Sequence, residues 1–206
     1  DFVAVLGYPG ATQRYLPVVE VERFIDQVFP ARIDLYGEWI AIFEALGGRD
    51  PALGIKVAAS KKSLANRHKN AEGMIAGLRA MKLVERRKLE EAALEQWAAR
   101  PENAGFADVL PEIRAISLER RDGFAAEFLL DNIGNAGNLL GVAVDVVRRA
   151  REAKKPDLER VSGFMDRDAK RLRDRVERRL RDFDPEVDAQ LLAALLVRAA
   201  AVPEAA

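Results

Sequence analysis

The sequence predicts an all-α fold, an irregular antiparallel helical bundle with one short β-strand at its N-terminal end. Three observations support this fold class. Alanine, leucine, arginine and glutamate, which are strong helix formers, dominate the 206 residues. Apolar residues recur every three or four positions through most of the chain, which is the helical period. The helical stretches are long and their connections short, as in an antiparallel bundle.

One short β-strand is predicted at the N-terminal end. Phe2 to Leu6 is an apolar, partly β-branched run, and the Gly-Tyr-Pro-Gly sequence of residues 7–10 forms a turn that ends it. A lone strand cannot form a sheet, so we expect its partner strands elsewhere in a longer parent protein. A chain that begins at Asp1 without methionine fits this expectation. The predicted domains are therefore a strand and turn in residues 1–16 and a helical domain in residues 17–206.

Helical spacing takes over after residue 17. Proline lacks the amide hydrogen that a helix needs, so Pro30 is expected to interrupt or kink the first helix. A second helical stretch is expected to stop at Gly47-Gly48. Asp50 followed by Pro51 is a favourable helix start, and it predicts a long helix past Leu78, with charged helical sequence after it. The first two apolar faces consist of Val18, Val21, Ile25 and Val28, and of Tyr36, Trp39, Ile40, Phe43 and Leu46.

The second half of the chain is predicted to be helical with two clear breaks, at residues 101–105 and at Lys154–Asp157. A helical pattern is expected from Phe106 to about Ala153. The helix after the second break has the most regular pattern, and Asp184-Pro185 ends it and starts the last helix. The apolar faces of these two helices consist of Val161, Met165, Ala169, Leu172, Val176 and Leu180, and of Val187, Leu191 and Leu195.

The sequence lacks the residues of the common catalytic and metal sites. It contains one histidine, His68, and no cysteine, so neither the base of a Ser-His-Asp triad nor an ordinary zinc site is apparent. Arg67 and Lys69 flank His68 and would disfavour the imidazolium that a general base must form. His68 is therefore interpreted as a solvent-facing helical residue. We expect no catalytic residue, no metal site and no cofactor in this chain.

Three glycines, Gly134, Gly137 and Gly141, follow one another at helical spacing. No strand precedes them, and the sequence contains no glycine pattern of a phosphate-binding loop. Their spacing instead indicates either close packing between helices or a break between two helices.

The charge pattern argues against nucleic-acid and membrane partners. The chain has 33 Lys or Arg and 33 Asp or Glu, so it has no net charge to attract it to an anionic surface. Between Arg148 and Arg181 there are 14 basic and 7 acidic residues, with Phe164 as the only aromatic. The acids are interleaved at helical spacing, and one aromatic residue provides no base-stacking platform. No apolar run reaches the ~18 residues that span a bilayer.

Three segments together resemble serine peptidase family 46, the bacterial dipeptidyl peptidases numbered 7 and 11. They lie in residues 1–15, 60–73 and 160–188, in the order and spacing of that family. Position 11 departs from the family pattern, because it holds alanine where a basic residue is common. Besides the N-terminal strand and turn, the residues that carry the resemblance are Thr12, Arg14, Tyr15, Ser60, Ala65, Asn66, Lys69, Gly73, Arg160, Gly163, Phe164, Arg167, Asp168, Asp184, Pro185 and Asp188.

The resemblance implies a chymotrypsin-like parent enzyme with two β-barrels, a catalytic triad between them and an inserted helical domain that caps the cleft. Residues 1–16 would then be the end of a barrel strand, and residues 17–206 the lid. The family's His and Asp lie upstream of this segment and its Ser lies downstream, so the fragment alone is expected to be inactive. The resemblance also implies a periplasmic or secreted parent and contacts with both barrel halves, and it leaves a homodimer open.

A dipeptidyl peptidase has to recognise the α-ammonium group of a peptide with a free N-terminus, and a buried cation needs acceptors that replace its water. In the family, an asparagine of the helical domain helps to bind this group, and the matching residue here is Asn66. The alternative interpretation of Asn66 is an ordinary exposed helical asparagine. In the family, the pocket for the penultimate side chain belongs to the second barrel, so this segment does not indicate the specificity.

Two other functions stay open. The chain could be a non-catalytic helical protein-interaction or scaffold module, which a partner pull-down or an exposed apolar face would favour. It could also bind nucleic acid through its basic helix, which a salt-sensitive shift with DNA or RNA would support.

Overall fold

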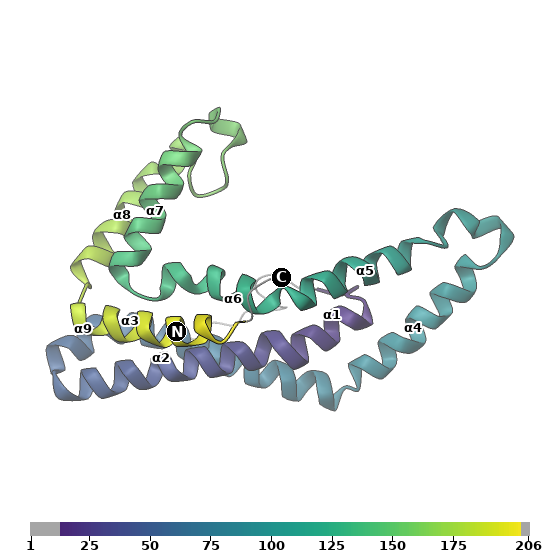
Figure 1. The fold of residues 1–206 in the computed structure, drawn as a ribbon, viewed down its shortest axis with the longest axis horizontal. Coiled ribbons are helices and arrows are strands. Elements are labelled where there is room, and N and C mark those ends of the chain that lie inside the picture. The colour runs from purple at the N-terminus through teal and green to yellow at the C-terminus, as the bar shows by residue number, and fades with distance from the viewer. Residues whose placement is uncertain (1–12, 203–206) are drawn as a thin grey trace, which may run out of the picture. The chain divides into compact units, whose positions relative to one another are not determined.

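The computed structural model describes residues 13–202, and it is all-α over that range (Figure 1). The strand expected at Phe2–Leu6 lies outside the described residues. Within residues 13–202, no helix is both long enough and apolar enough to cross a membrane. The α-helices are α1 (Val18–Arg23), α2 (Phe29–Arg49), α3 (Pro51–Ala80), α4 (Leu83–Ala98), α5 (Val109–Asp122), α6 (Phe124–Asn132), α7 (Asn138–Glu152), α8 (Ala169–Arg181) and α9 (Pro185–Ala200). A π-helical turn (Phe24–Val28) and short 3₁₀ turns (Pro101–Phe106, Ile133–Asn135, Asp157–Glu159, Asp166–Asp168) connect them.

The chain forms two compact units. Within the described residues, the first unit consists of residues 13–29 and 74–122, and the second of residues 30–73 and 123–202. The chain passes between the units at three places, which are the start of α2, the interior of α3 and the junction of α5 with α6. Each unit has its own set of packed helices.

In the first unit, α1 packs against α4 and α5. The buried carboxylate of Glu91 on α4 accepts hydrogen bonds from the backbone amide of Val18 at 2.6 Å and from the guanidinium of Arg114 on α5 at 2.7 Å. One carboxylate therefore connects all three helices. Within α1, Glu20 and Arg23 form an ion pair at 2.9 Å in which both side chains are buried. Such pairing is required because a buried charge without partners is strongly destabilising.

The second unit has the larger hydrophobic cluster, in which α2 and α9 are central. The side chain of Trp39 on α2 is almost fully buried, and its Nε1 donates a hydrogen bond to the carbonyl of Leu191 on α9 at 3.2 Å. Nearby, the hydroxyl of Tyr36 donates to Oδ1 of Asn132 on α6 at 3.3 Å. The buried members of this cluster are Leu35, Tyr36, Trp39, Phe43, Leu46, Leu53, Val57, Leu64, Ala136, Val187, Leu191, Ala194 and Leu195.

The α7–α8 hairpin confirms both expectations for the glycines (Figure 1). The guanidinium of Arg179 on α8 lies over Gly141 on α7 and donates to the carbonyl of Gly134 at 3.0 Å, which requires close packing. Gly137 has a φ of 143°, a conformation that L-residues rarely adopt, and it separates the 3₁₀ turn from α7. The glycines therefore provide a close helix contact at one position and a break at another.

The expected helical start at Val161 was wrong, because α8 begins later and the preceding residues form a loop. Gly163 in this loop has a φ of 94°, which is incompatible with a right-handed helix. The guanidinium of Arg160 bonds to Asp166 at 2.6 Å, and Arg149 on α7 bonds to the same carboxylate at 3.2 Å. These hydrogen bonds, that of Arg160 first, hold the pKa of Asp166 below its ordinary value. The loop residues that carry the family resemblance therefore contribute to local structure.

The helical pattern expected from Phe106 to Ala153 is in fact three α-helices. Gly123 separates α5 from α6, and a 3₁₀ turn with Gly137 after it separates α6 from α7. The expected break at residues 101–105 is confirmed, because a 3₁₀ turn lies between α4 and α5.

Two helix junctions in the first half depend on unusual backbone geometry. The interruption expected at Pro30 takes the form of the π-helical turn Phe24–Val28, which leads directly into α2. The charged sequence after α3 does not continue as one helix, because Lys82 adopts a left-handed conformation with φ of 47° and α4 begins after it.

Asp188 on α9 caps the N-terminus of α7. Its carboxylate accepts hydrogen bonds from the backbone amides of Asn138 at 2.9 Å and Leu139 at 2.8 Å. Replacing Asp188 by alanine is expected to lower the free energy of unfolding by about 1–2 kcal/mol, as the loss of a helix cap does. Urea denaturation of the two proteins measures the difference. Glu186→Ala on the same helix removes an exposed ion pair with Arg49 and is expected to cost less than about 1 kcal/mol. Equal losses in the two variants would contradict the capping role.

Candidate functional site

Asn66, the residue predicted to bind substrate, lies on α3 with an exposed side chain. It lines an open pocket of about 440 Å³. Asn70 and Arg67 of α3 and Arg32 and Tyr36 of α2 also line this pocket. All five residues belong to the second unit, so the pocket is a feature of one compact body.

The packing of α3 against α2 positions these side chains. Leu64 of α3 is buried in the core cluster, which holds this part of the helix in place. The two helices approach closely at their connecting turn, since a Cβ added to Gly47 would lie 2.9 Å from the Cα of Gly54. On α3, the spacing of four residues places Asn66 and Asn70 on the same face. The result is a polar face of α3 beside the start of α2.

The pocket offers more hydrogen-bond donors than acceptors. Each asparagine amide has one carbonyl acceptor and two donor hydrogens, whereas Arg32 and Arg67 only donate and carry positive charge. Tyr36 donates its hydroxyl proton to Asn132 and stacks on Trp39, with ring centroids 6.2 Å apart, so its orientation is fixed by the core. The described residues of the pocket therefore suit carbonyl or carboxylate groups. An ammonium group could use the asparagine carbonyls, but it would need a negative charge from outside this pocket.

Of the five pocket residues, only Asn66 was predicted from the sequence to bind substrate. Asn70 carries a detectable signal, because it repeats the residue type of Asn66 one helical turn later. Arg32 and Tyr36 carry no such signal, because their place beside α3 depends on the packing of two helices.

His68 is not the solvent-facing residue that the sequence predicted. Its side chain is partly buried, and its Nδ1 lies 3.4 Å from a carboxylate oxygen of Glu72. A Cβ added to Gly37 on α2 would lie 3.3 Å from Nε2 of His68, so the imidazole packs against the backbone of α2. Arg67 and Lys69 flank His68 in the sequence, and the helical spacing of four residues also brings Glu72 beside it.

Comparison with known proteins finds a match over the whole chain. Residues 1–206 match the family model described as peptidase S46. An Asp/Glu-specific dipeptidyl-peptidase of Shewanella putrefaciens is 29% identical over 191 residues, which is 93% of this chain and 26% of that protein. Dipeptidyl-peptidase 7 of Porphyromonas endodontalis is 28% identical over 197 residues, or 95% of this chain and 23% of that protein. Dipeptidyl-peptidase 7 of Capnocytophaga gingivalis is 33% identical over 114 residues, covering 55% of this chain and 16% of the relative. The chain thus spans at most 26% of the length of these three relatives.

Proposed function

This chain belongs to the peptidase S46 family, and we propose that it is the helical, substrate-gating part of a serine dipeptidyl peptidase that releases dipeptides from the free N-termini of oligopeptides. The names of its relatives support a dipeptidyl peptidase activity for the parent protein. Because the chain spans about a quarter of those relatives, that activity requires residues outside this segment. The segment alone is proposed to be inactive.

The observation that carries the proposal is the position of Asn66 in an open pocket on the surface of α3. There its carbonyl oxygen is available as an acceptor for the α-ammonium group of a peptide, and Asn70 offers a second acceptor one turn away. Arg32 and Arg67 would repel an ammonium group. The proposal therefore includes a carboxylate from elsewhere in the parent protein that supplies the negative charge.

The remaining parts of the proposal concern the parent protein. Two β-barrel halves would provide the catalytic triad and the pocket for the penultimate side chain, and the helical part would close over the bound peptide. The parent protein is also proposed to be periplasmic or secreted. Whether it forms a homodimer is left open.

Replacing Asn66 by alanine in the full-length peptidase is expected to lower kcat/KM for a fluorogenic dipeptide substrate about 10- to 100-fold. This range follows because a hydrogen bond to a charged group contributes about 1.5–3 kcal/mol. The N-acetylated substrate, which has no ammonium group, is expected to be inert with both proteins. Initial rates over a range of substrate concentrations measure the change.

Lys62→Ala is the matched control, because Lys62 is exposed on the same helix and does not line the Asn66 pocket. It is expected to leave the kinetics unchanged. Wild-type kinetics in the Asn66→Ala variant would remove Asn66 from the binding site. A parent protein without activity on any dipeptide substrate would refute the proposed enzyme and favour the scaffold function.

A further inference from the structure

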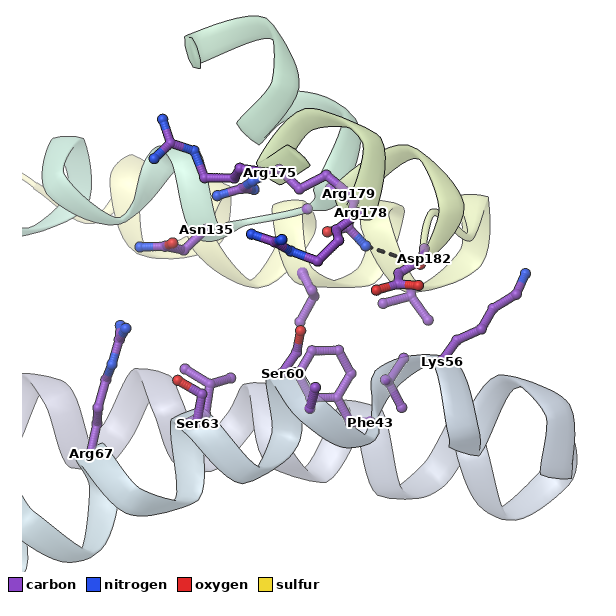
Figure 2. Close-up of a pocket in the computed structure, with 17 residues that line it drawn as sticks. Phe43, Lys56, Ser60, Ser63, Arg67, Asn135, Arg175, Arg178, Arg179 and Asp182 are labelled. Carbon is purple, nitrogen blue, oxygen red and sulfur yellow. Dashed lines mark hydrogen bonds between the residues drawn. The ribbon is translucent and has the colours of Figure 1, made fainter. Parts of the chain in front are cut away.

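A second cavity, of about 370 Å³, opens beside α3 in the same unit. Its floor is apolar, formed by Phe43, Val57, Leu64 and Leu191. Figure 2 shows Ser60, Ser63 and Arg67 rising from α3 on the side that faces the arginines of α8. The cavity therefore combines an apolar floor with polar and charged walls from two helices.

Cations outnumber carboxylates in the lining of this cavity. The cationic lining residues are Lys56, Arg67, Arg175, Arg178 and Arg179, and the only acidic one is Asp182. Asp182 bonds to Arg181 at 3.0 Å, so its charge is already paired outside the cavity. The lining thus has an excess of positive charge.

Two of these cations have a partner within the α7–α8 hairpin. Arg175 bonds to both carboxylate oxygens of Asp145 on α7, each at 2.9 Å. Arg179 lies 4.0 Å from the same carboxylate and donates to the carbonyl of Gly134. These two arginines therefore have structural partners.

The other three cations have no ion-pair partner within residues 13–202. Lys56 and Arg67 project from α3 and Arg178 from α8, and all three are exposed to solvent. Like charges that face one cavity repel one another, and an anion in that cavity would relieve the repulsion. Guanidinium groups in particular bind carboxylates with two parallel hydrogen bonds. The unpaired cations and the apolar floor together define a site for an organic anion.

We propose that this cavity binds the carboxylates of an acidic stretch within a peptide. The choice of a peptide rests on the proposed function, whereas the choice of a carboxylate rests on the charges of the cavity. Arg67 lines both this cavity and the pocket of Asn66, so the two sites are adjacent on α3. Lys56 and Asn66 lie about 15 Å apart along the helix axis. An extended peptide covers that distance in about four to five residues, which places the favoured acidic residues at about the fourth and fifth positions.

Calorimetric titration of the full-length protein with blocked pentapeptides tests this proposal. The probe is an N-acetylated, C-amidated pentapeptide with glutamate at its fourth and fifth positions, and the comparison peptide has glutamine there. The acetyl group removes the ammonium, so the measurement does not depend on Asn66 or on hydrolysis. At low salt the glutamate peptide is expected to bind about tenfold more tightly, with a difference that shrinks at high salt.

The variant Lys56→Gln/Arg178→Gln is expected to lose about tenfold in affinity for the glutamate peptide. The matched control is Lys62→Gln/Arg173→Gln, which removes exposed cations of the same two helices that do not line the cavity. It is expected to bind like the wild type.

Equal affinity for the glutamate and glutamine peptides would overturn the proposal, as would equal losses in the cavity variant and its control. Competition by sulfate at the concentration of the peptide would show a general anion site and overturn the peptide assignment. A failure of the proposed function would be seen in other measurements, as an absence of dipeptide release or as wild-type kinetics in the Asn66→Ala variant. A protein that releases no dipeptides but still binds the glutamate peptide through the cavity would support the cavity as a peptide site and refute the proposed enzyme activity.

Discussion

Replacing Trp39 by alanine is expected to lower the free energy of unfolding of the second unit by about 3–5 kcal/mol, the range observed for large aromatic residues in protein cores. The side chain of Trp39 on α2 is only 1% exposed, and it belongs to the core cluster that α2 and α9 share. The substitution removes the packed ring, its stacking on Tyr36 and the hydrogen bond to Leu191. This loss is a large fraction of the stability of an ordinary domain.

Chemical denaturation followed by far-UV circular dichroism measures this effect. Trp97→Ala provides a matched control, because Trp97 lies on α4 with 38% of its surface exposed. Its main ring contact is with Phe106, at 5.4 Å between centroids, so its loss is expected to cost about 1 kcal/mol. A cost of Trp39→Ala no larger than that of Trp97→Ala would contradict the packing of Trp39 against α9.

Replacing Gly141 by alanine is expected to destabilise the α7–α8 hairpin by about 1–3 kcal/mol, as overpacking does. The added Cβ would lie 1.6 Å from Nη1 of Arg179 and 2.7 Å from the carbonyl oxygen of Gly134. The guanidinium would have to leave its place, and the hydrogen bond to Gly134 would break. Alanine is a better helix former than glycine by about 1 kcal/mol, but that gain does not offset both losses.

The matched control is Gly77→Ala on α3, where an added Cβ meets no atom within 4 Å. There the helix propensity acts alone, so this variant is expected to be more stable by about 0.5–1 kcal/mol. Thermal denaturation of both variants should therefore give shifts of opposite sign. Stabilisation by Gly141→Ala would contradict the close approach of Arg179. Combining Gly141→Ala with Arg179→Ala is expected to be less damaging than the sum of the two changes, because the clash is then absent.

Helix starts with a local signal could be predicted from the sequence. Asp50 and Pro51 predicted the start of α3, and the structure confirms it, with the carboxylate of Asp50 accepting a hydrogen bond from the amide of Ala52 at 2.8 Å. Asp184 and Pro185 predicted the start of α9 in the same way. Such signals lie within three residues of the helix end and do not depend on the rest of the fold.

Other boundaries could not be predicted, because apolar spacing alone does not report backbone conformation. Val161 and Met165 continue the spacing of α8 into a loop, where Gly163 has a positive φ and Arg160 organises the carboxylates around it. Lys82, with its positive φ, likewise separates α3 from α4 within a stretch whose composition is helical throughout. In both cases a single backbone conformation overrides an otherwise helical pattern.

The candidate site was predictable only along one helix. Asn66 came from a motif within α3, and its neighbour Asn70 follows from the same helical spacing. The contribution of α2 depends on the approach of α2 to α3 at Gly47 and Gly54, which is a tertiary contact. The cationic cavity likewise requires α8 beside α3, and no local pattern indicates that pairing.

The cap that Asp188 provides for α7 bears on the order in which the second unit folds. The carboxylate and the amides of Asn138 and Leu139 are separated by 50 and 49 residues in the chain. Bringing them together closes a long loop, which has an entropic cost that a local cap avoids. The first turn of α7 therefore gains this cap only after α9 has docked, so nucleation of α7 is expected to follow the long-range collapse of the core rather than precede it.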